Sequence, residues 1–169
     1  IALTLAQIAE AVGGRLRLNG SDTAETPVSG DVDTDSRQIG AGGIFVAKPG
    51  ETTDGHLFVD TAVAAGAVLA IVEHEVAASV SQIVVADAVK ALADLAHDVV
   101  ARVRAGGRLR VVGITGSNGK TTTKNMLARI LGDEGETVAP RASCNNEVGA
   151  PLTMLRVTHT TRYLVCEFG

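Results

Sequence analysis

The chain has 169 residues, of which 46% are hydrophobic and 20% are charged, and its formal net charge is -4. This composition predicts a globular protein with one domain, or one small domain and part of a second. The acidic balance disfavours binding to nucleic acid through its phosphates. No apolar run approaches the roughly 20 residues that span a bilayer, and the start lacks a basic signal-peptide region. With two cysteines, we expect no disulfide framework and a cytoplasmic location.

The first hundred residues alternate between helical and strand patterns. Thr4 and Gln7 have the spacing of a capping box before an apolar stripe, and Gly13-Gly14 is expected to end that helix. Short strands and turns are expected over residues 15–43, which are rich in Gly, Asp, Ser and Thr. Further along, we expect strands over residues 44–47, 67–72 and 83–86, and helices over residues 57–65 and from Asp87 to about Gly106.

A break in the pattern at Ala105-Gly106-Gly107 predicts a domain boundary, with a first domain over residues 1–106 and a second over residues 107–169. Strands alternating with helices on both sides predict α/β architecture, with a mainly parallel sheet in the second part. About 60 residues are too few for a complete nucleotide-binding domain, so we expect that domain to be truncated. Its expected elements are strands over 108–114, 136–139 and 162–167, a helix over 120–131, and a turn or helix over 151–155.

The strongest chemical signal is the glycine-rich run over residues 113–123. A hydrophobic strand, a glycine-rich turn and a Lys-Thr pair that opens a helix form the arrangement that cradles a polyphosphate. Lys120 supplies positive charge for the terminal phosphates, and the Thr121 hydroxyl can coordinate Mg²⁺. The spacing is a variant of the phosphate loop, because Ile114 stands where the general motif has glycine. A glycine-rich connection with an incidental lysine is the alternative.

A second signal is Glu167, which ends an apolar strand downstream of this loop. In a parallel sheet, such a strand end would lie near the phosphates, where the carboxylate could hold Mg²⁺ directly or through water. The alternative is a surface glutamate at the end of a strand.

Three groups of segments resemble the Mur ligases, the ATP-dependent amide-forming enzymes of peptidoglycan precursor synthesis. The first is the phosphate loop T-G-S-N-G-K-T-T at residues 115–122. The second is Asp35-Ser36-Arg37 with the segments 43–47 and 54–58, which resemble the family's N-terminal domain. The third is S-C-N-N-E-V-G-A-P-L-T at residues 143–153, which resembles the segment of the member that adds a terminal dipeptide.

This resemblance covers essentially the whole chain and implies a fold, a reaction and a set of ligands. The family has three domains, of which this chain would hold the substrate-binding first domain and the opening part of the ATPase domain. The implied reaction uses ATP and Mg²⁺ to join D-Ala-D-Ala to UDP-MurNAc-tripeptide through an acyl phosphate. We expect the parent protein to be a monomeric ligase and this chain alone to be inactive.

The resemblance also implies roles for individual residues. Lys120 would be catalytic, and Mg²⁺ would be held by Thr121 and Glu167. The phosphates of ATP would be held by Thr115, Gly116, Ser117, Asn118, Gly119, Lys120, Thr121 and Thr122. The nucleotide-sugar substrate would be bound by Ser36, Arg37, Asn145 and Asn146, with Lys48 and the loop 50–54 as further candidates.

Several alternatives stay open at this point. Ser36 and Arg37 could serve only local turn chemistry. Other readings of the whole chain are a diaminopimelate- or lysine-adding Mur ligase and a non-catalytic UDP-sugar-binding module. A small phosphate-loop kinase or GTPase is disfavoured by the domain that precedes the loop. The four histidines, at positions 56, 74, 97 and 159, show no metal-binding spacing, and Cys144 and Cys166 are expected to be inert.

Overall fold

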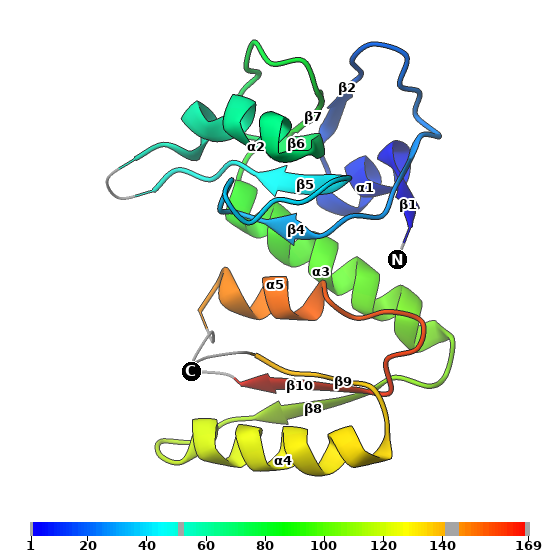
Figure 1. The fold of residues 1–169 in the computed structure, drawn as a ribbon, viewed down its shortest axis with the longest axis vertical. Coiled ribbons are helices and arrows are strands. Elements are labelled where there is room, and N and C mark those ends of the chain that lie inside the picture. Colours follow the sequence, from blue (N-terminus) through cyan, green and yellow to red (C-terminus); the bar gives the residue numbers. More distant parts are fainter. Residues whose placement is uncertain (1, 51–52, 141–145, 168–169) are drawn as a thin grey trace. The chain divides into compact units, whose positions relative to one another are not determined.

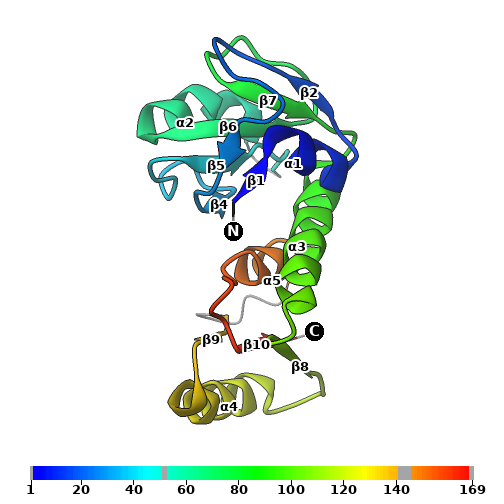
Figure 2. The same cartoon turned by 90° about the vertical axis from the view of Figure 1, so that its right-hand side faces the viewer.

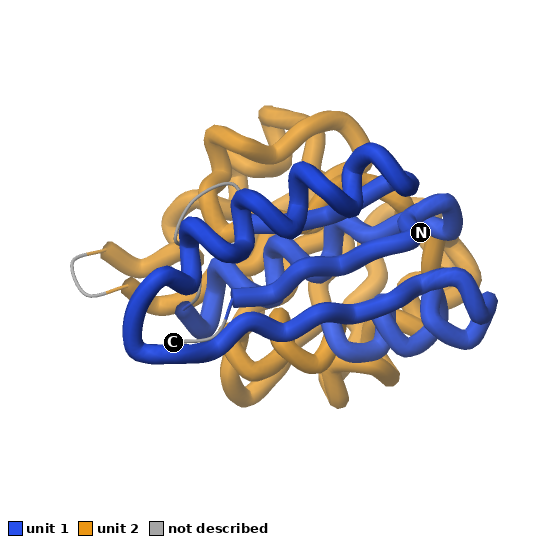
Figure 3. Tube along the Cα trace, turned by 90° about the horizontal axis from the view of Figure 1, so that it is seen from below, with its two compact units in different colours: residues 1, 96–169 blue, residues 2–95 orange. Residues whose placement is uncertain are grey.

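The structure is a computed structural model that describes residues 2–50, 53–140 and 146–167. The chain divides into two compact units, one of residues 2–95 and the other starting at residue 96 (Figure 3). The division falls inside helix α3 (Ala88–Ala105), which contributes residues to both units. The domain boundary near residue 106 stays a prediction. Among the described residues, no helix has the length and apolar character that a membrane span needs.

The unit of residues 2–95 is built on a five-stranded sheet with the order β2-β7-β6-β5-β4 (Figure 1). Strands β4, β5, β6 and β7 are parallel, and β2 pairs antiparallel with β7 at one edge. Strands β1 and β3 form a separate pair. The bounds are β1 Leu3–Thr4, α1 Leu5–Val12, β2 Arg15–Arg17, β3 Pro27–Val28, β4 Val32–Asp33, β5 Gly43–Val46, the 3-10 helix η1 Gly55–Phe58, α2 Val59–Ala65, β6 Ala67–Val72 and β7 Ser81–Val84.

Local sequence signals explain several of these elements. The capping box before α1 is confirmed, because the Thr4 hydroxyl accepts from the Gln7 N–H and the Gln7 side chain accepts from the Thr4 N–H. Gly13 ends α1 in the left-handed conformation that glycine adopts most readily. Asp87 caps α3 by accepting hydrogen bonds from the N–H groups of Val89 and Lys90, also as predicted.

Two predictions in this unit need correction. The helix expected over residues 57–65 begins as the 3-10 turn η1 and becomes α-helical only at Val59. The strand expected over residues 83–86 is β7, which starts at Ser81 and ends at Val84, where its partner β6 also ends. The first two residues of β7 are polar, so the apolar pattern in the sequence did not indicate where this strand begins. Ser81 and Gln82 are buried there because the first donates to Asp22 and the second bonds the backbone of Val76.

Apolar side chains fill the sheet on both faces. Phe45 and Ala70 belong to a buried cluster with Val59 and other residues of α2. Because side chains alternate along a strand, Leu69 and Ile71 of β6 point to the opposite face, where they are also fully buried. Burial of these apolar side chains on both faces stabilises the sheet. Polar side chains can therefore be placed in the loops at the strand ends without disturbing the core.

The second unit contains a three-stranded parallel sheet with the order β8-β10-β9, from β8 (Arg110–Ile114), β10 (Tyr163–Glu167) and β9 (Thr137–Val138). Helices α4 (Lys120–Glu134) and α5 (Gly149–Met154) cover its opposite faces (Figures 1 and 2). The predicted α/β class is confirmed, and so is the parallel sheet expected in the second part of the chain. The first strand starts at Arg110 instead of residue 108, because Gly107 turns the chain at a φ of 78°.

Candidate functional site

The phosphate loop joins the carboxyl end of β8 to the start of α4. Residues 115–119 are exposed, and Gly116 and Gly119 have φ values of 147° and 77°, a region that side chains with a Cβ rarely enter. The Lys120 ammonium folds back over the loop and donates to the Gly116 carbonyl oxygen at 2.6 Å. The hydrogen bond from Lys120 to Gly116 thus closes the loop and keeps the positive charge of the lysine next to the loop backbone.

The start of α4 is open to an anion. Its first residue is Lys120 and its N-cap is Gly119, which has no side chain to accept from the first turn. The first N–H groups of a helix have no partner within the helix, and they carry the positive end of its dipole. The backbone at Lys120, Thr121 and Thr122 therefore offers donors at the point where the loop delivers a phosphate.

Glu167 lies beside this helix start, as the sequence predicted. Strand β10 pairs in parallel with β8, and Glu167 is opposite Ile114, the last residue before the loop. The residue is 3% exposed. The Thr121 hydroxyl lies 3.3 Å from one oxygen of the carboxylate and 3.4 Å from the other. The structure thus brings together the two residues that the sequence named as metal ligands, across 46 positions of chain.

The chemistry of these two groups fits Mg²⁺. A hydroxyl and a carboxylate are both hard oxygen donors, which Mg²⁺ prefers, and Mg²⁺ commonly takes one or two protein ligands together with phosphate oxygens and water. The metal role of Thr121 and Glu167 stays a proposal that this geometry supports.

Of the two asparagines that the sequence singled out, Asn145 lies outside the described residues. The Asn146 carboxamide oxygen accepts from the N–H groups of Val148 at 3.3 Å and Gly149 at 2.7 Å, at the start of α5. That oxygen is therefore engaged in a local turn that leads into α5. A substrate contact from Asn146 would have to use its amide N–H groups.

Ser36 and Arg37 lie in the other unit, in the turn that follows β4. Ser36 is buried, and the Arg37 guanidinium is exposed and donates to both carboxylate oxygens of Asp35. The Asp35 N–H in turn donates to the Asp33 carboxylate. The local hydrogen bonds that the sequence left as an alternative are present. They hold the backbone of this turn and orient the Arg37 side chain toward Asp35. The role of both residues toward substrate stays a proposal.

Replacing Arg37 with alanine is expected to change the titration of Asp35. The side-chain hydrogen bond from Arg37, followed by its backbone N–H, lowers the pKa of Asp35 from 3.8 to about 2. Since this pKa is depressed in the folded state, the pair stabilises the fold above the unfolded value, and that stabilisation is lost as the pH falls from about 4 to 2. We expect the pKa of Asp35 to return toward 3.8 in Arg37→Ala, measured by NMR titration of the carboxyl carbon.

The control for this titration is Asp54, whose pKa is also lowered but by His56 and not by Arg37. It should titrate identically in both proteins. An unchanged pKa of Asp35 in the variant would show that Arg37 does not hold this turn.

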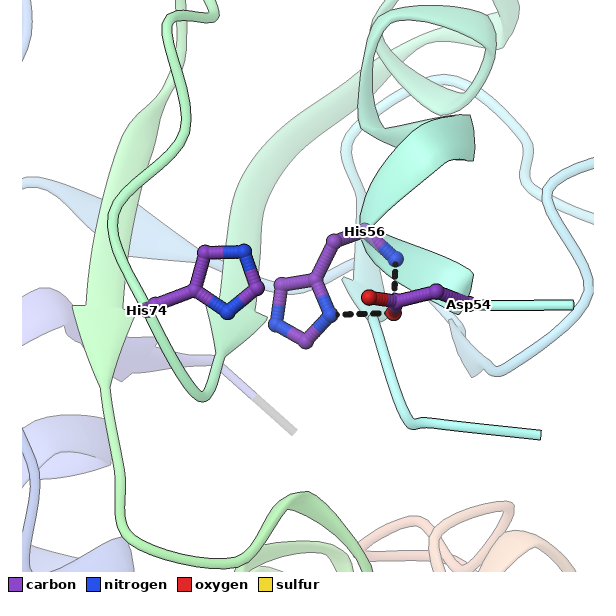
Figure 4. Close-up of side chains that lie close together, drawn as sticks. All are labelled: Asp54, His56 and His74. Atoms are coloured by element: carbon purple, nitrogen blue, oxygen red, sulfur yellow. Dashed lines mark hydrogen bonds and ion pairs between the residues drawn. The ribbon is translucent and has the colours of Figure 1, made fainter.

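One cluster was missed by the sequence analysis. Asp54, His56 and His74 each place a possible ligand atom within 4.8 Å of the others (Figure 4). The histidines are 18 positions apart and lie on different elements, so no local spacing indicated them. The sequence signal nearest to the cluster is the segment 54–58, which contains Asp54 and His56 and resembles the N-terminal domain of the Mur ligases. His97 and His159 are exposed, and burial raises the pKa of the Cys166 thiol, as expected for an inert cysteine.

Comparison with known proteins decides the family. The model of the Mur ligase family catalytic domain matches residues 31–103, and that of the Mur ligase middle domain matches residues 114–169. The UDP-N-acetylmuramoyl-tripeptide--D-alanyl-D-alanine ligase of Mycobacterium tuberculosis is 44% identical over the whole of this chain. The chain belongs to the Mur ligase family. The resemblance of the sequence to the Mur ligases is confirmed.

Solved structures of Mur ligases agree in fold. MurF from Acinetobacter baumannii is 35% identical, has a TM-score of 0.84 and is matched over 100% of this chain and 36% of its own. MurF from Thermotoga maritima in complex with ADP is 34% identical, with a TM-score of 0.69, over 81% of this chain and 31% of its own. This chain likewise spans 37% of the length of the mycobacterial ligase. It therefore corresponds to about a third of a complete Mur ligase.

Proposed function

We propose that this chain provides the nucleotide-sugar-binding and ATP-phosphate-binding part of a ligase that joins D-Ala-D-Ala to UDP-MurNAc-tripeptide. The observation that carries the proposal is the placement of Glu167 against Thr121 at the mouth of a phosphate loop. The names of the relatives, at up to 44% identity over the whole chain, supply the substrates. The segment 143–153 favours this dipeptide-adding reaction over the addition of diaminopimelate or lysine.

The reaction needs ATP because a carboxylate is a poor electrophile and has a poor leaving group. Transfer of the γ-phosphoryl group to the terminal carboxylate of the tripeptide forms a bond from carboxylate oxygen to phosphorus and releases ADP. The amine of D-Ala-D-Ala then attacks the acyl carbon, loses a proton, and expels inorganic phosphate as the amide forms. Catalysis of the first step is mostly positioning and charge neutralisation.

The residues of this chain divide that work. Lys120 and the N–H groups at the start of α4 neutralise and orient the phosphates of ATP. Thr121 and Glu167 hold Mg²⁺, which supplies positive charge to the phosphate oxygens when bound. Ser36 and Arg37 contact the nucleotide-sugar substrate in the other unit, where a guanidinium suits phosphate oxygens. The expected cytoplasmic location and monomeric state remain predictions.

Calorimetric titration of this chain with UDP-MurNAc-tripeptide, with UDP as the comparison, tests the proposal. We expect the tripeptide substrate to bind more tightly than UDP, because the sugar and peptide add contacts to those of the nucleotide. Equal binding of the two would leave only a UDP-sugar-binding module. Absence of binding to both would remove the assignment of substrate to this chain. We also propose that this chain alone forms no amide, which is checked by release of ADP with both substrates present.

A further inference from the structure

The carboxyl edge of the sheet in residues 2–95 gathers residues from three neighbouring strands. Strands β4, β5 and β6 are parallel and adjacent, so their carboxyl ends lie at one edge. The turn with Ser36 and Arg37 follows β4, Lys48 follows β5, and His74 follows β6. Neighbouring strands are about 4.8 Å apart, so the ends of β4 and β6 are separated by roughly 10 Å. Ligands of open parallel sheets bind at this edge.

His56 is the buried centre of the cluster at this edge, and its hydrogen bonds determine its tautomer. The backbone N–H of Glu73 donates to Nε2 at 2.8 Å, so Nε2 carries no proton. The other ring nitrogen, Nδ1, lies 2.6 Å from the Asp54 carboxylate and must be the donor there (Figure 4). The ring is therefore neutral with its proton on Nδ1, and it joins the loop after β5 to the end of β6.

The same bonds exclude a metal as the purpose of the cluster. A metal on Nδ1 would move the proton of neutral His56 to Nε2, where it would face the donating N–H of Glu73. A metal on Nε2 would displace the Glu73 N–H from its acceptor. The rings of His56 and His74 are also stacked at an interplanar angle of 19°, so their in-plane lone pairs are nearly parallel and do not converge on one ion.

The stack gives His74 a fixed place at the edge of the sheet. Its ring centroid lies 4.0 Å from that of His56, and the residue is exposed whereas His56 is 3% exposed in its side chain. Because one face of the His74 ring covers His56, the exposed surface of the ring is its other face and its edge. His74 is thus an exposed residue whose ring rests on His56, and hydrogen bonds at both nitrogens of His56 hold that lower ring in place.

We propose that His74 is a stacking platform for the uracil base of the nucleotide-sugar substrate and that His56 is the positioning residue that holds it. This inference rests on the proposed function. Nucleobases stack on aromatic side chains, and histidine is one of those used. A nucleoside diphosphate has a flat base at one end and a charged diphosphate at the other. This edge offers a matching pair of groups, the flat ring of His74 after β6 and the guanidinium of Arg37 in the turn after β4.

The test is calorimetric titration of the chain with UDP. His74→Ala should weaken binding about tenfold, the loss typical of one stacked base. His74→Phe, which keeps a flat ring but no ring nitrogen, should stay within about threefold of the parent chain. His74→Gln, which keeps polar hydrogens but no ring, should be as weak as His74→Ala. The matched control is His97→Ala, another exposed histidine, which should bind UDP as the parent does.

The role of His56 is tested by its coupling to His74. His56→Gln offers an oxygen to the Glu73 N–H but removes the ring beneath His74, so it should weaken UDP binding by itself. It should add nothing in the background of His74→Ala, because the group through which it acts is already gone. Additive losses would show that His56 acts only on the fold, and a thermal melt of each variant confirms that the protein is folded.

The outcomes separate this inference from the proposed function. If His74→Ala binds UDP as tightly as the parent chain does, the stacking role is overturned. The same holds if His74→Gln binds UDP well and His74→Phe does not. Both results would leave the nucleotide site itself in place. No binding of UDP by the parent chain would remove the proposed function and the inference together.

Discussion

Replacement of Lys120 by alanine is expected to lower kcat at least about 10³-fold in a chain that extends to the length of its relatives, because charge neutralisation dominates phosphoryl transfer. The Lys120 ammonium is held across the phosphate loop by the Gly116 carbonyl, so it is already placed when ATP arrives. Of the residues proposed to contact the nucleotide-sugar, Ser36 and Arg37 belong to the other unit, and Lys120 is not among the remaining ones. The dissociation constant of UDP-MurNAc-tripeptide should therefore remain within about twofold of the parent value.

The measurement pairs steady-state release of ADP with calorimetric binding of the substrate. Lys90→Ala is the matched control, since Lys90 is an exposed helical lysine whose partner is Asp94, within its own helix. It should leave both quantities unchanged. A large loss of substrate binding in Lys120→Ala would mean that the two sites have been assigned to the wrong parts of the chain.

Replacement of Glu167 by glutamine is expected to lower kcat about 100-fold at a fixed low concentration of Mg²⁺. The amide keeps the shape of the carboxylate and can still accept from the Thr121 hydroxyl, so the fold should be retained. It removes one negative charge from the proposed metal site, which weakens the attraction for a divalent cation. Part of the activity should return as Mg²⁺ is raised, and a titration of rate against Mg²⁺ measures this directly.

Glu134→Gln is the matched control for that titration, because Glu134 is an exposed glutamate at the far end of α4. It should show the Mg²⁺ dependence of the parent. A Glu167→Gln variant whose rate falls without any change in its Mg²⁺ requirement would contradict a metal role and assign Glu167 to positioning of Thr121.

The phosphate loop and its neighbouring glutamate could be predicted because each is a local pattern and the parallel sheet brings them together. A short strand rich in apolar residues, followed by a glycine-rich turn and a Lys-Thr pair, is informative without any tertiary contact. The assumption of a parallel sheet then places Glu167 beside it, and the observed pairing with Ile114 has that geometry.

The features that the sequence did not reveal depend on contacts between distant residues. The Asp54, His56 and His74 cluster forms only when the loop after β5 meets the end of β6. The start of β7 was missed for a related reason. Its polar residues Ser81 and Gln82 break the apolar pattern of a buried strand, and their partners become visible only in the fold.

The parallel sheets in both units have a consequence for how this protein can change over time. Apolar strand interiors carry the stability, whereas the residues assigned to ligands lie at the ends of strands or in the turns and the helix start that follow them. Substitutions in those turns leave the packing around Phe45 or Leu164 untouched. Such an arrangement allows one scaffold to acquire a preference for a different ligand through a few changes at the strand ends, without first becoming unstable.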